Sequence, residues 1–488
     1  MNNFYNTSYI YKKLKNFITI FLLMLNSVFT NSDQFRFSGN IDLIYASRLS
    51  DLSTLRLPYR LIKIDIEHIK DDISINGKFA LEHHLRTDAT FLSSSNPEDF
   101  FIDMREIYLT YSAQKYELRI GKQIYSWGNV DENSPLDIVS PYDYYYMFYR
   151  GTNKKLSNLS LAIDYYLGKL KLQTVFSPIH STNRLPIGGD DFPIELPIYP
   201  SPSSILPIRE NPFESGFFAS YSTPIGDISA LFFRGYDRIF NLTGVNVYGH
   251  GSDFSFPHVD ILFSFRKTNV FGVGGVFIYD RFTIRFDHGY FSTIDKNFSI
   301  DRISTFNPLY YDSLLSYPLN EKANYSQSVV QFEIQLPSEI NFSTQYFSHN
   351  KIDYTSDSLP IQENINIPNL DIDLDQVTPE LIFMPGMGSP LALLTNSALI
   401  LRLNKLHLDG RLSLSITSLI DLERNFNSGN NFGSLTELNL KYSISDALQW
   451  ISGITKINDV KNHPDGKEYP FNQMQNFSHA RFEIRYYF

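Results

Sequence analysis

The segment RFTIRFDHGY at residues 281–290 decides the fold, because its alternate residues differ in polarity. One face would carry Phe282, Ile284, Phe286 and Tyr290, and the other Arg281, Thr283, Arg285 and Asp287. Side chains of a β-strand point alternately to its two faces, so the pattern predicts a strand with one apolar and one polar side. A slip of one residue would exchange the two sides, which fixes the register.

The same alternation recurs from one end of the chain to the other. The polar positions of segments 61–68, 116–123, 406–415 and 480–488 carry charges of both signs, at Lys63, Asp65, Glu67, Glu117, Arg119, Arg411, Arg481, Glu483 and Arg485. A soluble β-sandwich alternates in the same way, with its polar face in bulk water. Alternation alone therefore leaves a sandwich and a membrane barrel open.

The N-terminus favours export. Lys12, Lys13 and Lys15 precede an apolar run at 17–25, and small and polar residues follow at 26–32. This order predicts a secretory signal peptide over residues 1–30 and a mature chain of 31–488. The apolar run is too short for a membrane-spanning helix, which needs about 20 residues. Because no later uninterrupted apolar stretch reaches about 18 residues, a membrane-embedded chain would have to be a closed barrel.

The C-terminus has a pattern of its own. Phe482, Ile484, Tyr486 and Phe488 occupy one face of the last segment, and Arg481, Glu483 and Arg485 the other. This resembles the C-terminal insertion signal of outer-membrane barrel proteins. The resemblance implies two sets of partners: the barrel-assembly machinery, which would read the strand by β-augmentation, and outer-membrane lipid with lipopolysaccharide.

A second resemblance lies in GKQIYSWG at 121–128, which is followed by Asp131, Asp137 and Asp143. The stretch is similar to a motif of large porin-like outer-membrane proteins of Gram-negative bacteria, including a family without an assigned substrate. We expect Trp127 and Gly128 to leave the hydrocarbon at the membrane interface. Loop Asp and Gly mostly serve turns, which favours a loop-folding role over a ligand site. Asp137, Asp143 and Arg150 would fold inward to pair with lumen charges such as Arg119.

Together these features predict an all-β protein, a single transmembrane antiparallel β-barrel of about 16–18 strands over 31–488 with long extracellular loops. The 32 Tyr and 40 Phe residues agree with this fold. Three long connections are expected: a Pro-rich one between Phe176 and Phe213, and two others near 292–324 and 350–397. The last holds an acidic set that is more readily explained as a solvated loop than as a cation site: Glu363, Asp371, Asp373, Asp375 and Glu380.

Several functions are disfavoured. The chain has no Cys, and its net charge of -10 argues against nucleic-acid partners. Adjacent His83 and His84 would point to opposite faces of a strand and could not chelate one metal as a pair. No catalytic motif is recognised, so the sequence predicts no catalytic residues, no metal and no cofactor. Strand alternation begins at residues 35–45, which leaves no room for a plug domain.

Three functional hypotheses remain. The first is a porin-like channel for passive passage of small solutes, with Lys63, Asp65, Glu67, Glu117, Arg119, Arg281, Arg285, Asp287, Arg411, Arg481, Glu483 and Arg485 lining the lumen. The second is a non-conducting surface barrel that acts in envelope architecture, adhesion or polysaccharide handling. The third and least favoured is a barrel hydrolase with a Ser, a His and an acid at the outer rim.

Overall fold

A computed structural model describes residues 34–84, 100–148, 151–186, 200, 203–208, 212–295, 302–304, 306–358, 378–422, 432–460 and 469–488. The predicted signal peptide at 1–30 lies outside these residues, as do Arg150, Glu363, Asp371, Asp373 and Asp375.

Eighteen antiparallel strands form one closed sheet. Around the barrel they are β1 (Gln34–Arg48), β2 (Pro58–Lys70), β3 (Ile73–His84), β4 (Phe100–Ser112), β5 (Tyr116–Gln123), β6 (Asn158–Leu167), β7 (Leu170–Ser177), β8 (Glu214–Thr223), β9 (Gly226–Tyr236), β12 (Lys267–Tyr279), β13 (Phe282–Ile294), β15 (Lys322–Leu336), β16 (Ile340–Thr355), β17 (Ser397–His407), β18 (Leu412–Asp421), β19 (Ser434–Ser443), β20 (Leu448–Asn458) and β21 (His479–Tyr487). The predicted fold class and strand number are confirmed.

The first and last strands close the barrel. β1 pairs with β21 from Asn40 opposite Tyr487 to Arg48 opposite His479. Beyond this ladder, Gly39 and Phe488 exchange two backbone hydrogen bonds of 3.0 and 3.1 Å. Inside the seam, the Asp42 carboxylate accepts hydrogen bonds of 2.7 and 3.1 Å from Arg485. Closure removes the free sheet edges that a lipid bilayer would not tolerate.

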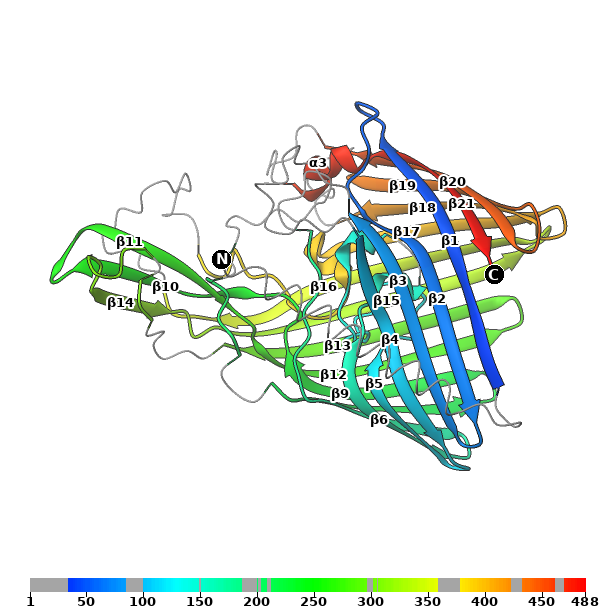
Figure 1. Cartoon of the computed structure of the whole chain (residues 1–488), viewed down its shortest axis with the longest axis horizontal. Helices are drawn as coiled ribbons and strands as arrows, with labels where there is room; N and C mark the ends of the chain where they lie inside the picture. The colour runs from blue at the N-terminus through cyan, green and yellow to red at the C-terminus, as the bar shows by residue number, and fades with distance from the viewer. Residues whose placement is uncertain are drawn as a thin grey trace, which may run out of the picture.

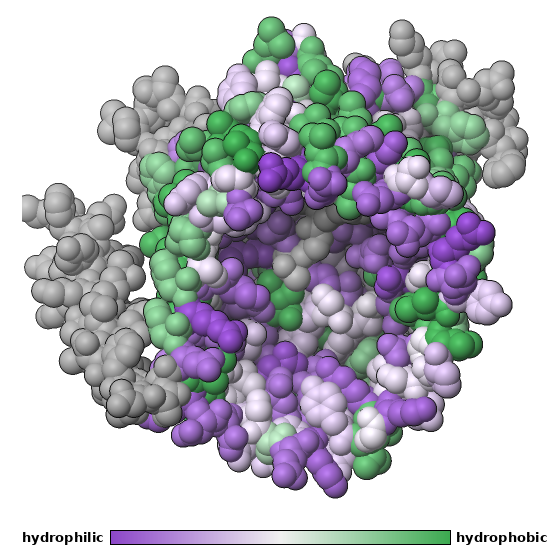
Figure 2. Space-filling model, turned by 90° about the vertical axis from the view of Figure 1, so that its right-hand side faces the viewer, coloured by the Kyte–Doolittle hydropathy of each residue, from purple (hydrophilic) through white to green (hydrophobic). Residues whose placement is uncertain are grey.

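The two faces of the wall differ as the alternation predicts. Large apolar side chains such as Leu43, Ile284 and Phe482 are exposed on the outer surface. Figure 2 shows the hollow interior from one end, with mostly polar residues around it. An even number of antiparallel strands with an apolar outside and a polar inside is the architecture of outer-membrane barrels. The protein is therefore an outer-membrane β-barrel.

The two ends of the barrel are unequal. Connections at one end, such as 71–72, 113–115, 168–169 and 280–281, are tight turns, and we call this the short-turn end. The other, long-loop end carries the extended connections, which in outer-membrane barrels face the cell exterior. Short helices occur there: η1 (Tyr144–Tyr146), η2 (Gly151–Lys154), η5 (Pro390–Leu393), α3 (Pro470–Gln473) and η7 (Met474–Phe477). Among the described residues, no helix is long and apolar enough to cross a membrane.

A second sheet projects beyond the long-loop end (Figure 1). It consists of β10 (Asn241–His250), β11 (Asp253–Ser264) and β14 (Ser313–Pro318), so part of the predicted loop at 292–324 is a strand. The base of this projection holds Arg266, which contacts Asp237 at 2.7 Å and Glu321 at 2.6 Å and is almost fully buried. The ion triad ties the ends of β9, β12 and β15 together where the projection begins.

The register makes a prediction about two neighbouring residues of β13. Replacing Ile284, on the outer face, by Arg should lower the free energy of unfolding in lipid by about 2–4 kcal/mol, because the charge would enter hydrocarbon. Replacing Thr283, which faces inward and pairs with Glu333, by Arg should cost much less. Denaturant unfolding in vesicles measures both. Equal losses for the two variants would contradict the assignment of the faces.

Candidate functional site

The connection between β5 and β6, residues 124–157, folds into the barrel, and we call it the inner loop. Its own polar groups shape it. The Asp137 carboxylate accepts backbone hydrogen bonds from Trp127 at 2.8 Å and Gly128 at 2.9 Å. The Ser140 hydroxyl accepts one from Tyr125 at 2.7 Å, and Lys155 contacts Asp137 at 2.7 Å. These bonds hold the two limbs of the loop against each other.

Trp127 does not lie at the membrane interface as the sequence analysis expected. Its side chain is 3% exposed and packs against the inner face of the barrel wall. The indole Nε1 donates a hydrogen bond of 2.5 Å to Gln173 of β7, and its ring stacks on Phe218 of β8 with centroids 5.7 Å apart. The expectation failed because an inward polar partner satisfies the indole N–H better than the interface would. At Gly128, a Cβ would lie 2.3 Å from Ser134, so this close approach needs glycine.

Asp287 of β13 fastens the tip of the inner loop to the opposite wall. Its carboxylate accepts four hydrogen bonds from the loop: the Asn129 backbone at 2.8 Å, the Asn129 side chain at 2.7 Å, the Val130 backbone at 3.1 Å and the Ser134 hydroxyl at 2.7 Å. A carboxylate that accepts several N–H and O–H bonds is a strong, directional anchor. The inner loop therefore spans the barrel from β5 to β13.

Two neighbouring strands continue this attachment. Gln331 of β15 donates to the Asp131 carboxylate at 3.0 Å and accepts from the Asp131 backbone at 3.1 Å. Gln345 of β16 donates to the Glu132 carbonyl at 2.8 Å. Arg285 bonds to the Asn129 carbonyl at 3.1 Å and to Glu333 at 2.7 Å. The tip is thus fixed to three adjacent strands.

Three buried charges and the partly exposed Arg184 hold the other side of the inner loop. Asp143 contacts Arg60 of β2 at 2.7 Å and Arg184 of the β7–β8 connection at 2.5 Å. Glu82 of β3 contacts the same two arginines at 2.9 and 2.8 Å. Asp143 therefore folds inward and pairs with a lumen charge, although its partner is Arg60. The expected Arg119 pairs instead with Asp164 at 2.7 Å and Glu117 at 3.2 Å.

Arg238, after β9, joins a second network to the inner loop. Its guanidinium donates to the Ile138 carbonyl at 3.2 Å, the Val139 carbonyl at 3.1 Å and the Glu214 carboxylate at 2.9 Å. His180 lies 2.9 Å from the same carboxylate. Burial lowers the pKa of His180, with the nearby Arg238 charge acting in the same direction and Glu214 opposing both. His180 is therefore held neutral beside a charged pair.

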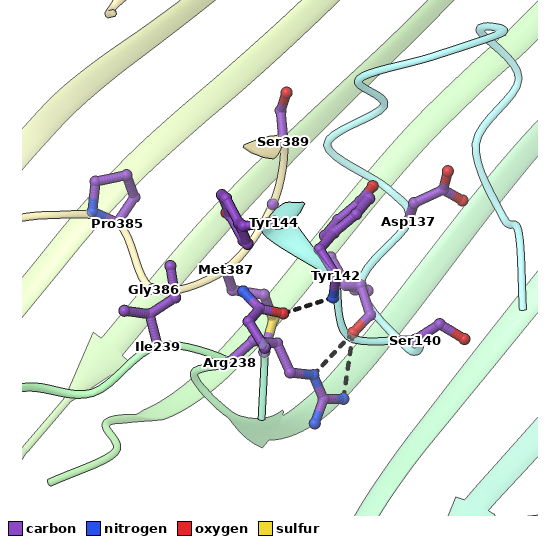
Figure 3. Close-up of a pocket in the computed structure, with 13 residues that line it drawn as sticks. Asp137, Ser140, Tyr142, Tyr144, Arg238, Ile239, Pro385, Gly386, Met387 and Ser389 are labelled. Atoms are coloured by element: carbon purple, nitrogen blue, oxygen red, sulfur yellow. Dashed lines mark hydrogen bonds between the residues drawn. The ribbon is translucent and has the colours of Figure 1, made fainter. Parts of the chain in front are cut away.

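The inner loop leaves two spaces. A cavity of about 10 Å³ lies between the loop, Arg238 and residues 385–389 (Figure 3). It has room for about one water molecule. The Asn183 side-chain oxygen accepts a hydrogen bond of 2.7 Å from the Tyr142 backbone. In Figure 3 the Arg238 guanidinium extends toward the backbone of the inner loop. This space is a seam between loops and is too small for a solute.

The second space is a recess of about 80 Å³ between the inner loop and the wall of β17–β21. Glu132, Asn133, Met147 and Phe148 form the loop side. The wall side is one row of paired residues across five strands: Arg402, Thr417, Glu437, Thr455 and His479. The recess therefore has polar groups on both sides, and an apolar edge to which Met147 and Phe148 of the loop and Ile400, Leu419 and Leu435 of the wall contribute.

One row nearer the long-loop end, the same strands turn apolar, with Ile400, Leu419, Leu435 and Ile457 in register. These residues belong to a buried cluster that includes Leu391, Leu394, Tyr469, Phe471, Met474 and Phe477 from two outer connections. We call this cluster the apolar roof. The Tyr469 hydroxyl fixes it to the wall by a 2.6 Å hydrogen bond to Asp421. The sequence analysis did not predict the apolar roof, because the roof combines short segments that are far apart in the chain.

Ten of the twelve residues expected to line the lumen lie on wall strands at inward-facing positions: Lys63, Asp65, Glu67, Glu117, Arg119, Arg285, Asp287, Arg481, Glu483 and Arg485. Arg281 and Arg411 instead lie exposed in short turns. The alternation of polar and apolar residues continues from the strands into these turns, so the pattern did not show where each strand ends. The Asp409-Gly410 dipeptide is a turn signal that would have placed Arg411 correctly.

Other expected residues are placed as follows. Phe482, Tyr486 and Phe488 are exposed on the outer surface, and their reading by the assembly machinery stays a prediction. His83 stacks on Phe100 with ring centroids 4.9 Å apart. Glu380 contacts Lys351 at 2.9 Å. Within the described ranges, no group of three or more His, Asp or Glu residues is placed to hold a metal ion.

No family model matches the sequence, and no curated protein matches it. Solved structures resemble the fold. OccK2 (OpdF) of Pseudomonas aeruginosa is 9% identical, with 94% of this chain and 98% of that chain covered and a TM-score of 0.46. OccAB2 of Acinetobacter baumannii is 10% identical over 93% and 98%, with a TM-score of 0.44. A loop deletion mutant of OmpT, an outer membrane protein of Vibrio cholerae, is 9% identical over 94% and 100%, with a TM-score of 0.39.

Removing the Asp287 anchor should release the tip of the inner loop. Asp287→Ala leaves four donors of the loop without their acceptor, at a cost of at least about 2 kcal/mol for the attached conformation. Hydrogen exchange of the amides of residues 129–134 should become correspondingly faster. Asp227→Ala, which changes an exposed inward carboxylate on β9, is the control. Unchanged exchange in Asp287→Ala would contradict the anchor.

The neutral His180 predicts a dependence of stability on pH. Because its pKa is lowered in the folded protein, the unfolded chain binds the proton first as pH falls through about 6.5. Stability should therefore decrease from about pH 7.5 to about pH 5, and less so in His180→Gln. Thermal unfolding at both pH values measures this. His250→Gln, at an exposed histidine of the projection, should keep the wild-type dependence, and a His180→Gln profile equal to wild type would refute the assignment.

Proposed function

We propose that the protein is a porin-like channel through which small solutes cross the outer membrane passively. The recess beside the inner loop carries this proposal, because charged and polar residues of β17–β21 line it. Figure 2 shows a hollow with mostly polar residues around it at the short-turn end. A bore of 16–18 strands is wide enough for an aqueous channel unless loops fill it. The inner loop narrows this bore on one side and leaves the polar row of β17–β21 facing the remaining space.

The charges of that row would set solute preference through local fields. Arg402 and His479 lie at its two ends, with Glu437 between them. Arg481, one row nearer the short-turn end, approaches Glu437 at 3.8 Å. Charges of both signs, at Arg402, Glu437 and Arg481, thus line this part of the interior. Such an interior would select small polar solutes by their size and by the positions of their charged groups, and less by their net charge.

The apolar roof supports a second candidate, a non-conducting barrel that acts in envelope architecture, adhesion or polysaccharide handling. Its residues close the space above the recess toward the long-loop end, and most of them are almost fully buried. A hydrophobic constriction can stop ion flow by excluding water. The two candidates therefore differ in one property, which is whether the roof opens.

Planar-bilayer recording of the purified protein separates the two candidates. A channel gives stepwise conductance, and Thr417→Trp should lower each step by roughly half or more, because the indole would enter the recess. Ser418→Trp, whose side chain faces outward, should leave the steps unchanged. Silence of the wild-type protein, combined with conductance after Phe477→Ser in the roof, would establish the closed barrel instead.

A further inference from the structure

The outer surface of β8, β9, β12 and β13 carries a row of aromatic residues. Phe217, Phe232, Phe271 and Tyr290 are successive cross-strand partners. Their exposed fractions are 42, 37, 54 and 36%, and the rings of Phe232 and Phe271 lie 5.0 Å apart. Aromatic girdles mark the boundary between hydrocarbon and headgroups in outer-membrane barrels. This row therefore marks the outer boundary of the hydrocarbon on this side of the barrel.

The next two outward rows toward the long-loop end are polar and then basic. The first contains Ser215, Arg234, Asn269, Ser292 and Asn324 as successive partners. The second contains Lys267, Ile294 and Lys322. Arg234 and Lys322 are exposed, and Lys267 is partly exposed. Three cations thus stand together directly above the aromatic row.

The spacing of these cations suits one ligand. Lys267 and Lys322 are separated by one strand, which puts their Cα atoms about 10 Å apart. Arg234 pairs with Asn269, two residues from Lys267, so those Cα atoms are roughly 8 Å apart. Long side chains can converge over such distances. Asp353, the exposed partner of Asn324, is the one acidic group among the described residues of these two rows, which therefore carry more positive than negative charges.

We propose that Arg234, Lys267 and Lys322 bind the phosphate groups of a phosphorylated glycolipid headgroup in the outer leaflet. Guanidinium and ammonium groups form strong charge-assisted hydrogen bonds with phosphate. The three residues face lipid, at the level where headgroups stand above the aromatic row. Because barrel strands are tilted, the three cations stand at staggered heights. That arrangement fits an extended headgroup with several anionic groups better than it fits a single small anion.

Binding of lipid A to the purified full chain in detergent tests this proposal by native mass spectrometry. The bisphosphorylated form should bind, and its dephosphorylated form should bind about tenfold or more weakly, since one charged hydrogen bond accounts for about that factor. Arg234→Gln combined with Lys322→Gln should weaken binding of the bisphosphorylated form to the same extent. Lys456→Gln, at an outward basic residue of β20, is the matched control and should bind as wild type.

Three results would overturn the proposal. Equal binding of the two lipid forms would mean that acyl chains alone are recognised. Unchanged binding of the bisphosphorylated form by the double variant would exclude these residues as the site, once heat-modifiable electrophoretic mobility has shown that the variant is folded. Displacement of the lipid by millimolar inorganic phosphate would mean that a free anion, and not the headgroup, is the ligand. If the double variant fails to fold, the two single variants give the same comparison, with a smaller loss expected from each.

Discussion

Hydrogen bonding of the backbone in hydrocarbon is the constraint on which the rest of this structure depends. A strand in a bilayer has no water to satisfy its N–H and C=O groups, so every strand must have a partner on both sides. The chain meets this demand by pairing β1 with β21. Closure then forces one face of every wall strand to meet lipid and the other to meet an enclosed interior, which is why a period of two dominates the sequence.

A closed sheet of this width creates a polar interior that needs filling or solvation, and the inner loop occupies much of it. The loop is fixed at both ends by buried carboxylates: Asp287 reaches it from the wall, and Asp143 reaches the wall from it. Asp143 forms ion pairs, whereas Asp287 accepts hydrogen bonds from neutral groups of the loop. Buried charges that are held in this way fix geometry more than they add net stability. The interior is therefore organised by electrostatics at mid-height and by apolar packing toward the exterior, and the recess lies at the border between these two regions.

Local sequence patterns predicted the wall but not what fills it. The alternation correctly predicted whether Ile284, Asp287 and Phe482 face outward or inward, because neighbouring side chains in a strand point to opposite sides. Trp127 was misplaced because its environment depends on Gln173, a partner 46 residues away. Arg281 and Arg411 were misplaced because a strand pattern does not show where it turns. The apolar roof had no sequence signature, since its members come from separate connections whose only common property is their place in the barrel.

The projecting sheet has a mechanical consequence. β10, β11 and β14 continue directly from wall strands, and the Arg266 triad stiffens the root where they leave the rim. A pull on the tip would thus pass through short backbone connections into β9, β12 and β15. Gln331, which bonds to the inner loop, lies on β15, and Asp287 lies on β13, which pairs with β12 and β15. The projecting sheet is in this way mechanically coupled to the wall strands that hold the inner loop in the bore.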